Sequence, residues 1–368
     1  MAANSNLHKA KDTKYDEFYT QLTDVSKELM HYKEHFKGKV VFCNCDDPTW
    51  SAFWKYFHLN FKALGLKKLI STHYDKTEPT YKMEYEGGDD NNIEAGTITP
   101  LEGNGDFRNA ECIELLKESD IVVTNPPFSL FREYVACLME YKKKFVILGN
   151  MNSTTCKEIF NFMRANELWL GCMAGSKTYR VPDNYDGKYF IEDGIKYVKM
   201  GNTEWFTNLD IQKRHEKLIL WKHYTPEEYP KYDNYDAINV DKIADIPVDY
   251  NGIMGVPISY LDKHNPDEFE ILGVTRGYAG DFAEWAVPEA YPTKKYINCV
   301  QHRRNGTNSK NGMANTRATI LIDKKPSDKD YYTADNADGM MEIVYARILI
   351  RRKVVSNYAN YRNENQSI

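Results

Sequence analysis

With 368 residues, the chain is long enough for two domains that each have their own core. Charged residues make up 27% of it and hydrophobic residues 42%, which is ordinary for a globular protein, and no apolar run approaches the length of a transmembrane helix. The start is polar and lacks the apolar core of a signal peptide, so we expect a cytoplasmic protein rather than a membrane or secreted one.

The cysteines bear on metal and redox sites, and the net charge bears on nucleic-acid binding. Seven cysteines are scattered along the chain, and the pair in Cys43-Asn44-Cys45 suits neither a tetrahedral zinc site nor a redox CxxC motif. We therefore expect reduced thiols and no metal. The net charge of −5 is not that of a typical nucleic-acid-binding protein, but the distribution of charge matters more than its sum.

The first part of the chain alternates between helical and strand patterns. Apolar residues at helical spacing over 24–37 end at Gly38, and the apolar stretch 39–43 is typical of a buried strand. The same reasoning predicts helices at 50–64, 109–118, 129–143 and about 154–165, and strands at 67–72, 120–124, 145–149 and 168–171. This alternation predicts an α/β fold with a doubly wound, mostly parallel sheet.

From about residue 172 the pattern changes to β-rich segments separated by turns, as in antiparallel strands that close one edge of the sheet. A stretch rich in Pro, Tyr and Asp at 224–240 is typical of a connection between domains. We therefore predict two domains, 1–225 and 226–368. The second has strand-like pieces without regular alternation, for which we expect a mixed α+β fold.

One predicted strand ends unusually, because the four residues after it are Asn125, Pro126, Pro127 and Phe128. In a parallel α/β sheet, ligands collect at the carboxyl ends of the strands. The prolines stiffen the turn and remove N–H groups while keeping their carbonyl oxygens. The side-chain oxygen of Asn125 and the backbone oxygen of Pro126 can therefore accept both hydrogens of one planar amino group. Phe128 offers a ring face to a flat base.

This arrangement suits methyl transfer to an amino nitrogen. Such a nitrogen is a poor nucleophile because its lone pair is delocalised, and two acceptors favour a pyramidal nitrogen whose lone pair faces an electrophilic methyl group. The chemistry needs positioning rather than a strong general base. A plain Pro-Pro turn is the alternative, but the position between an apolar strand and Phe128 favours an active site. An adenine within a duplex must be flipped out to reach it.

Several stretches together resemble the EcoRI-type adenine-specific DNA methyltransferases. They are "LHKAKDTKYDEFYTQ", "VVFCNCDDP", "NFKALGLKKLI", "TNPPF", "WFTNL" and "VPISYLDKHNPDEFEILG", and they span about 7–275. The resemblance implies a Rossmann-like sheet that binds S-adenosylmethionine, with S-adenosylhomocysteine as product, and a C-terminal target-recognition domain. It implies N6-adenine methylation of a specific duplex site such as GAATTC in a restriction-modification system, by a monomer encoded by a bacterium or a phage. Whether a partner restriction endonuclease acts on the same site stays open.

The resemblance assigns roles to the Asn-Pro-Pro-Phe residues and to a stretch near the start. In such enzymes the four residues hold and stack the target adenine, and Asn125 also lies beside the cofactor. The stretch "DEFYT" resembles the cofactor motif, so that Phe18, Tyr19 and Thr20 line the methionine end of the cofactor. A polar turn before a helix explains this stretch nearly as well.

Two further acidic positions are assigned to the cofactor by the resemblance. Asp106, expected at the end of a short strand, accepts from the adenine amino group of the cofactor, and Phe107 lies against its ring. Capping of the helix at 109–118 is the alternative role for Asp106, but Asn109 is better placed to cap. Asp75, after another predicted strand, is expected to bind the ribose hydroxyls.

The loop after the first strand departs from the usual pattern of such enzymes. Most carry a glycine-rich turn there, because glycine lets the backbone approach a ligand closely. Here the loop reads Cys43-Asn44-Cys45-Asp46-Asp47-Pro48, a departure that the EcoRI-type enzymes share. Asp46 or Asp47 is then expected to make the polar contacts to the cofactor, although capping of the next helix explains one of them equally.

The C-terminal part contains the candidate DNA contacts. Residues 291–322 contain six Lys or Arg and no Asp or Glu, and we assign DNA contacts to Arg303, Arg304, Lys310 and Arg317. A second basic group, in "YARILIRRK", lies near the end of the chain. A solvated basic face is the equally weighted alternative for both. Trp205 and Phe206 lie where the family often has a second aromatic wall for the flipped base, and a core pair explains them equally.

Two other functions compete with DNA adenine methylation. The first is methylation of RNA or of protein glutamine, although such enzymes usually carry Tyr in place of Phe128 and lack a long C-terminal region. The second is a non-catalytic DNA-binding protein with a degenerate methyltransferase fold. The unusual loop at 43–48 favours the second, whereas the intact "TNPPF" and "NGDF" stretches argue against it.

Overall fold

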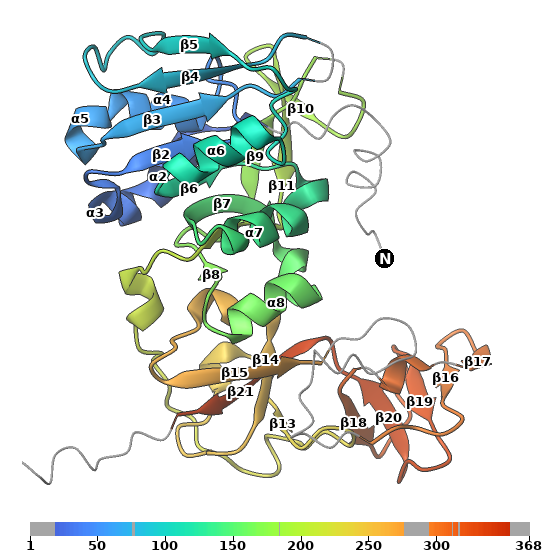
Figure 1. Cartoon of the computed structure of the whole chain (residues 1–368). Coiled ribbons are helices and arrows are strands. Elements are labelled where there is room, and N and C mark those ends of the chain that lie inside the picture. Colours follow the sequence, from blue (N-terminus) through green and yellow to red (C-terminus); the bar gives the residue numbers. More distant parts are fainter. Residues whose placement is uncertain are drawn as a thin grey trace, which may run out of the picture. The chain divides into compact units, whose positions relative to one another are not determined.

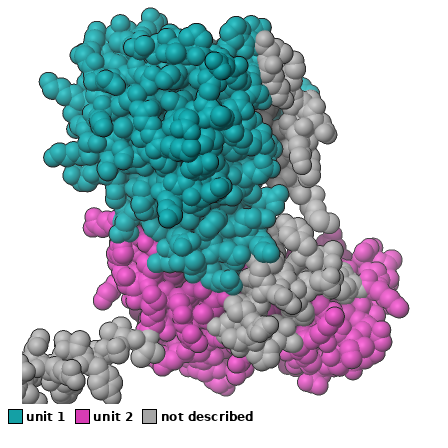
Figure 2. Space-filling view, in the orientation of Figure 1, with its two compact units in different colours: residues 1–211 teal, residues 212–368 magenta. Residues whose placement is uncertain are grey.

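The computed structural model describes residues 19–75, 78–183, 185–275, 294–310, 312–315 and 317–353. The chain folds into two compact units, residues 1–211 and 212–368, which Figure 2 distinguishes by colour. The domain boundary proposed from the sequence lies at 225. Phe18, assigned to the cofactor by resemblance, lies outside the described residues.

Unit 1 is built around an eight-stranded sheet with the order β5-β4-β3-β2-β6-β7-β12-β8 (Figure 1). Its centre is parallel and consists of β3 (Lys68–Thr72), β2 (Val40–Cys43), β6 (Ile121–Thr124) and β7 (Lys144–Asn150). These strands are apolar runs with nearly every residue buried, as expected for parallel strands covered on both faces. The predicted α/β fold with a parallel centre to its sheet is therefore confirmed.

Antiparallel strands flank this parallel centre on both sides. One side carries β4 (Tyr81–Tyr85) and β5 (Thr97–Pro100), and on the other β12 (Thr203–Thr207) lies between β7 and β8 (Trp169–Leu170). No strand was predicted from the sequence at the positions of β4 and β5. The sheet is thus mixed rather than mostly parallel.

Helices alternate with the parallel strands along the chain (Figure 1). They are α2 (Leu22–Leu29), η1 (Met30–Tyr32), α3 (Lys33–Phe36), α4 (Ala52–Leu59), α5 (Phe61–Leu64), α6 (Ala110–Glu118), η2 (Phe128–Leu130), α7 (Phe131–Glu140), η3 (Met151–Thr155) and α8 (Lys157–Arg164). Ser51 begins α4 by accepting from the amides of Phe53 (3.1 Å) and Trp54 (3.2 Å). Gly65 ends α5 in the left-handed conformation, with φ 63°.

Alternate residues of the strands pack on opposite faces of the sheet. Val123 of β6, Leu148 of β7 and Trp205 of β12 join a core cluster with side chains of α2 and α4. On the other face, Phe206 of β12 packs against Phe131 of α7, with ring centroids 4.9 Å apart. This two-residue period follows from the pleat and fixes which side chains share a face.

A second sheet in unit 1 differs from the sequence-based expectation. Its order is β1-β9-β11-β10, with β1 (Tyr19–Thr20), β9 (Lys177–Arg180), β11 (Ile195–Met200) and β10 (Phe190–Glu192). The expectation that the segments after residue 172 close the edge of the main sheet is correct for β12 and wrong for these strands. They pair with one another and with the chain start, a non-local pairing that local patterns do not encode.

Unit 2 is β-rich. One sheet has the order β13-β14-β21-β15, formed by β13 (Ile238–Asn239), β14 (Met254–Pro257), β21 (Arg347–Arg352) and β15 (Phe269–Val274). The other has the order β17-β16-β19-β20-β18, formed by β16 (Val300–His302), β17 (Asn308–Lys310), β18 (Thr319–Ile322), β19 (Tyr331–Thr333) and β20 (Met340–Ile343). The described residues of this unit form short 3-10 turns, η4 (Gln212–His215), η5 (Ile243–Asp245), η6 (Ile258–Lys263) and η7 (Gly312–Asn315), where a mixed α+β fold was expected.

Candidate active site

The topology of unit 1 marks one place for a ligand. From β2 the chain passes to β3 on one side of it, whereas β6 and β7 lie on its other side. In open α/β sheets, ligands bind outside the carboxyl ends of the strands at such a reversal of strand order. The loops that follow β2 and β6, residues 44–47 and 125–128, meet there, and we call this region the catalytic edge.

A row of buried polar side chains forms the floor of the catalytic edge. The hydroxyl of Thr72, at the end of β3, donates to the Asn44 side-chain oxygen at 3.0 Å. The one hydroxyl proton of Thr124, at the end of β6, is shared between the Asn44 backbone oxygen and the Asp46 carboxylate. The hydroxyl proton of Ser71 is likewise shared between the backbone oxygens of Cys43, at 3.2 Å, and of Asp46. These hydroxyls link the ends of β2, β3 and β6 by hydrogen bonds, so the loops that follow these strands begin at fixed positions.

The Asn-Pro-Pro-Phe turn lies at this edge, directly after β6. Pro126 is buried, and Asn125, Pro127 and Phe128 are half-buried. Phe128 packs against the main core cluster and starts the short helix η2. The backbone N–H of Asn125 donates to the carboxylate of Asp46 at 3.3 Å. The structure therefore brings this turn and the loop after β2 into direct contact.

Asp46 is buried and accepts hydrogen bonds from both loops. One oxygen accepts from the hydroxyl of Thr124 and from the Asn125 amide, and the other accepts from the Ser51 hydroxyl at 3.3 Å. Burial raises the pKa of Asp46 to about 7, because desolvation outweighs the hydrogen bonds that favour its charged form. This carboxylate links the loop after β2 to the Asn-Pro-Pro-Phe turn, residues 125–128, which we call the catalytic turn.

Asp47 has separate partners. Its carboxylate accepts from the Tyr81 hydroxyl at 2.9 Å and from the Thr49 hydroxyl at 2.7 Å, and it lies 3.0 Å from Nδ1 of His73. Burial alone would raise the pKa of Asp47, but these hydrogen bonds outweigh burial and lower it to about 2. The two acidic side chains of this loop, Asp46 and Asp47, thus both accept hydrogen bonds from other residues of the protein.

Cys45 adopts the left-handed conformation that the missing glycine would supply. Its φ is 64°, a region that residues other than glycine rarely enter and that costs them roughly 1–2 kcal/mol. The loop after β2 therefore turns sharply without a glycine, which removes the geometric objection raised by its sequence. Burial raises the pKa of the Cys45 thiol, so it is not a reactive thiolate.

The loop before α6 packs tightly against the loop after β3. Gly105 has φ 74°, and a Cβ there would lie 2.2 Å from the backbone oxygen of His73. The amide of Asp75 donates to the backbone oxygen of Asn104 at 3.2 Å. Glycine is required at this contact, and it brings Asp75 and Asp106 onto adjoining loops.

Asp106 forms an ion pair in the structure. Its carboxylate accepts from Nε of Arg108 at 2.9 Å and from a terminal guanidinium nitrogen at 2.7 Å, and this pair lowers the pKa of Asp106. The nearest preceding strand, β5, ends at Pro100, so the expectation that Asp106 ends a strand is wrong. Phe107 is buried, edge-on to Tyr134 at 4.9 Å between ring centroids. Asn109 precedes α6 as expected, but its side chain makes no capping bond.

The other candidate cofactor residues lie in the second sheet of unit 1. Tyr19 and Thr20 form β1 and pair with Arg180 and Tyr179 of β9. Thr20 is buried, and its hydroxyl has no hydrogen-bond partner among the described residues. A buried hydroxyl without a partner is costly, which makes Thr20 a candidate for contact with a ligand.

Trp205 and Phe206 are core residues in the structure. Both rings are buried and they face opposite sides of the sheet, where Trp205 packs against Phe53 at 6.0 Å between centroids. The indole nitrogen of Trp205 has no hydrogen-bond partner among the described residues. A role of these two rings at the target base stays a prediction.

Two side chains at the catalytic edge were missed from the sequence. Asn150 ends β7, and its side-chain oxygen accepts from the Asn152 amide at 2.9 Å, so its buried amide nitrogen points away and has no partner among the described residues. The buried hydroxyl of Tyr134, on α7, also lacks a described partner. Polar residues at the ends of apolar strands were the signal for Asn150, but nothing local marked Tyr134.

The candidate DNA contacts of unit 2 lie on one hairpin and beside it. We call residues 300–310, which comprise β16, the turn and β17, the basic hairpin. Arg303, Arg304 and Lys310 are exposed on it, and Arg317 is half-buried just before β18. None of these four side chains forms an ion pair within the described part of the chain. Their charge is therefore accessible to an anionic partner.

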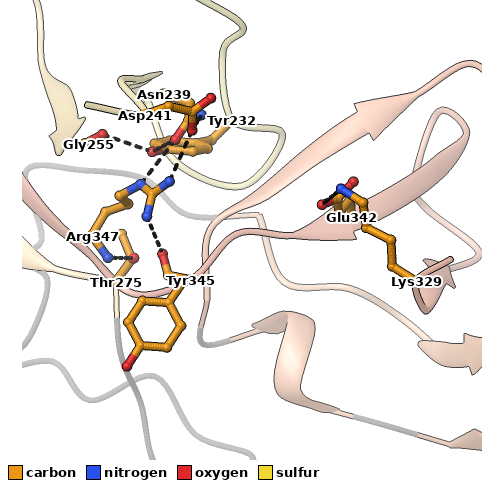
Figure 3. Close-up of polar contacts among 9 residues, drawn as sticks. All are labelled: Tyr232, Asn239, Asp241, Gly255, Thr275, Lys329, Glu342, Tyr345 and Arg347. Carbon is orange, nitrogen blue, oxygen red and sulfur yellow. Dashed lines mark hydrogen bonds and ion pairs between the residues drawn. The ribbon is translucent and has the colours of Figure 1, made fainter. Parts of the chain in front are cut away.

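The second basic group has a different environment, because β21 is an inner strand of its sheet. Arg347 donates to the Asn239 side chain at 3.2 Å, to Asp241 at 3.1 Å and to the backbone oxygen of Tyr345 at 3.3 Å (Figure 3). Arg351 pairs with Glu270 at 2.6 Å. Arg352 lies over the Phe269 ring, 4.7 Å from its centroid. Arg347 thus serves the fold of unit 2, whereas Arg351 and Lys353 are exposed, and a role of this second group at DNA stays a prediction.

Two negative findings concern the described residues alone. They contain no group of three or more His, Cys, Asp or Glu side chains placed to hold a metal ion. They also contain no helix of sufficient length and apolar character to cross a membrane.

Comparisons with known proteins agree with this geometry. A family described as "Adenine-specific methyltransferase EcoRI" matches residues 6–353. The type II methyltransferase M.EcoRI of Escherichia coli is 48% identical over 297 residues, which cover 75% of this chain and 91% of that protein. The type II methyltransferase M.MpnI of Mycoplasma pneumoniae is 40% identical over 275 residues, covering 72% and 84%.

A third relative, the type II methyltransferase M.MgeORF184P of Mycoplasma genitalium, is 37% identical over 276 residues, covering 73% of this chain and 85% of that protein. No solved structure matches the chain significantly. The family match spans both units and includes the catalytic edge and the basic hairpin. The chain therefore belongs to the EcoRI family of adenine-specific DNA methyltransferases.

Proposed function

We propose that this adenine-specific DNA methyltransferase transfers the methyl group of S-adenosylmethionine to N6 of an adenine that is flipped out of a specific duplex sequence. The observation that carries the proposal is the position of Asn125–Phe128 at the point where strand order reverses. We further propose a GAATTC-like site and protection of that site from a restriction endonuclease. The relatives support a bacterial cytoplasmic setting, and we expect a monomer.

Residues of the catalytic edge and of the second sheet of unit 1 suit a nucleoside-containing cofactor. Thr20 carries a buried hydroxyl without a described partner, and Cys45 gives the loop after β2 the sharp turn that close approach to a ligand needs. Asp75 and Asp106 lie on adjoining loops, as two contacts to one nucleoside require. When bound, S-adenosylmethionine supplies an electrophilic methyl group and leaves as S-adenosylhomocysteine.

We assign the polar contacts to this cofactor as the sequence suggested. Asp75 accepts from the ribose hydroxyls, and Asp106 accepts from the adenine amino group beside Phe107. Tyr19 and Thr20 line the methionine end. Of the two acids after β2, we assign the cofactor contact to Asp47, because a carboxylate has about four acceptor positions and Asp47 retains capacity for a ligand, whereas Asp46 contacts the turn after β6.

The chain promotes the transfer by holding the amino group. Asn125, through its side-chain oxygen, and Pro126, through its backbone oxygen, accept the two N6 hydrogens, while Phe128 stacks on the base. As the methyl group bonds to N6, the nitrogen becomes positive, and the two oxygens stabilise that charge. One N6 proton then leaves to solvent, because an N-methyl ammonium centre of this kind is a strong acid and needs no strong base.

The basic hairpin supplies the DNA-holding surface that base flipping requires. Unpairing and unstacking one adenine costs a few kcal/mol, which contacts to the DNA backbone must offset. Arg303, Arg304 and Lys310 are exposed there. We assign them, with Arg317, to phosphate contacts, and Trp205 and Phe206 to support of the base pocket from within the core.

Transfer of tritium from labelled S-adenosylmethionine tests the proposal. Duplex DNA, RNA and cell-extract protein are compared as substrates, and the labelled base is identified after hydrolysis of the DNA. We expect label in duplex DNA, as N6-methyladenine at one short sequence. Label in RNA or in protein glutamine instead would replace the DNA substrate, and binding of DNA without binding of S-adenosylmethionine would remove the enzymatic role.

A further inference from the structure

We propose that Asp46 is a positioning residue for methyl transfer, whose buried carboxylate holds the backbone at Thr124 and Asn125 so that the Asn125 side chain is fixed toward the target amino group. This inference rests on the proposed function of Asn125. It concerns how the acceptor is held rather than which groups touch the substrate.

The contacts of Asp46 form a bridge between two loops that are far apart in sequence. Its Oδ2 atom accepts from Thr124 Oγ1, 78 residues away, and from the Asn125 amide at 3.3 Å. These are the last residue of β6 and the first residue of the catalytic turn. The two prolines that follow carry no N–H, so the Asn125 amide is the backbone donor through which the start of this turn can be held.

Asp46 is also held by hydrogen bonds from two serines. Its Oδ1 atom accepts from Ser51 Oγ at 3.3 Å, and Ser51 is anchored as the N-cap of α4. The hydroxyl of Ser71 donates to the backbone oxygen of Asp46. Because Asp46 is hydrogen-bonded to Ser71 of β3, to the N-cap of α4 and to the catalytic turn, β3 and α4 help to fix where the turn lies.

The neighbouring carboxylate has a different task, which argues that the bridge is not a general property of an acidic loop. Asp47 is held by Thr49, His73 and Tyr81 on the side of β3 and β4. Within the described residues, its hydrogen bonds do not include the turn after β6. Among the described residues, the backbone amide of the turn after β6 donates to the carboxylate of Asp46 and not to that of Asp47.

The charge state of Asp46 follows from what surrounds it. The titratable groups that interact with it include Asp47, the thiols of Cys43 and Cys45, and the hydroxyl of Tyr134. An ionised carboxylate accepts from both Thr124 and Asn125. A protonated carboxyl carries no charge, so its oxygen is a weaker acceptor and the bridge weakens. The bridge therefore strengthens as the pH rises through about 7, the pKa to which burial brings Asp46.

The experiment compares Asp46→Asn and Thr124→Val with Asp120→Asn as the matched control. Asp120 links the opposite ends of the same two strands, because its carboxylate accepts from the Val40 amide at 2.9 Å. Single-turnover methyl transfer to duplex DNA, the Kd for S-adenosylmethionine, and the pH dependence of the rate are measured for each folded variant. Thermal unfolding reports stability separately, and Thr124→Val carries the test where Asp46→Asn does not fold.

We expect the transfer rate of both test variants to fall about tenfold to a hundredfold, because a misplacement on the order of 1 Å costs about that much. The Kd for S-adenosylmethionine should stay within about threefold, and the rise in rate through pH 7 should disappear in Asp46→Asn. The control should keep the rate and pH profile of the unmodified enzyme.

Two results would overturn the inference while the unmodified enzyme still methylates adenine in DNA. One is a transfer rate for Asp46→Asn and Thr124→Val equal to that of Asp120→Asn. The other is a loss that appears wholly in the Kd for S-adenosylmethionine, which would make Asp46 a cofactor ligand. An unmodified enzyme without activity on DNA would instead refute the proposed function.

Discussion

The catalytic edge of unit 1 and the basic hairpin of unit 2 present their polar side chains in opposite ways. At the catalytic edge, Asn44, Asp46 and Thr124 are buried and hydrogen-bonded to one another. On the hairpin, Arg303 and Arg304 are exposed and form no ion pair within the described part of the chain. Chemistry needs groups held in place before the substrate arrives, whereas binding to a polyanion needs accessible charge.

Because of this difference, we expect substitutions at the catalytic edge to lower the rate of methyl transfer and substitutions on the basic hairpin to weaken DNA binding. The largest effect is expected for Asn125→Ala, which removes the side chain that we propose as an acceptor for the target amino group. Transfer should fall about a thousandfold, as when a preorganised hydrogen-bonding group is lost. The Kd for S-adenosylmethionine and for DNA should stay within about threefold.

Asn161→Ala is the control for that variant, because Asn161 is an amide on α8 that contacts Arg164. Single-turnover assays at saturating DNA and cofactor measure the rate. Turnover of Asn125→Ala near that of the control would remove the proposed mechanism.

The converse variant is Arg303→Ala combined with Arg304→Ala. DNA affinity should weaken about tenfold or more, and the slope of log Kd against log salt should decrease by about two, because two phosphate contacts are lost. The transfer rate at saturating DNA should stay unchanged. Lys329→Ala is the control, since this lysine of unit 2 pairs with Glu342 at 2.7 Å (Figure 3). An unchanged salt slope in the double variant would show that the hairpin does not face DNA.

Arg347→Met tests a basic residue of unit 2 that stabilises the fold. The Arg347 side chain is 11% exposed and donates hydrogen bonds to Asn239, Asp241 and the Tyr345 carbonyl. The free energy of unfolding of unit 2 should fall by about 2–3 kcal/mol in urea titration. The control is Arg351→Met, whose exposed ion pair with Glu270 contributes about 1 kcal/mol or less. Equal losses in the two variants would contradict the assigned environments.

The smallest effect concerns the pH dependence of stability at Asp46 and Asp47. The pKa of Asp47 is lowered to about 2, so its stabilisation is complete above pH 4 and is lost as the pH falls toward 2. The pKa of Asp46 is raised to about 7, so its ionisation lowers stability as the pH rises from about 4 to 7.

Unfolding midpoints of Asp46→Asn and Asp47→Asn across pH 2–8 test these signs. Relative to the unmodified protein, Asp46→Asn should become more stable as the pH approaches neutrality. Asp47→Asn should lack the fall in stability that the unmodified protein shows as the pH drops from about 4 toward 2. The same pH trend in both variants would contradict the opposite environments of the two carboxylates.

The sequence predicted the features that local patterns encode. The alternation of strands and helices predicted the parallel centre of the sheet, and the apolar run before Asn125 predicted that the Asn-Pro-Pro-Phe stretch follows a buried strand. The pairing of β1 with β9 and the bridge from Asp46 to Thr124 depend on residues far apart in the chain. Arg347 likewise meets Asp241 across 106 residues, so its burial could not be distinguished from the exposure of Arg303 by composition alone.

The most direct test of the account is to sequence the DNA of a bacterial host that lacks its own adenine methylation and expresses this protein. The account predicts N6-methyladenine at one short duplex sequence with the unmodified chain, and none with Asn125→Ala expressed at the same level. Host DNA without N6-methyladenine when the folded, unmodified protein is present would contradict it.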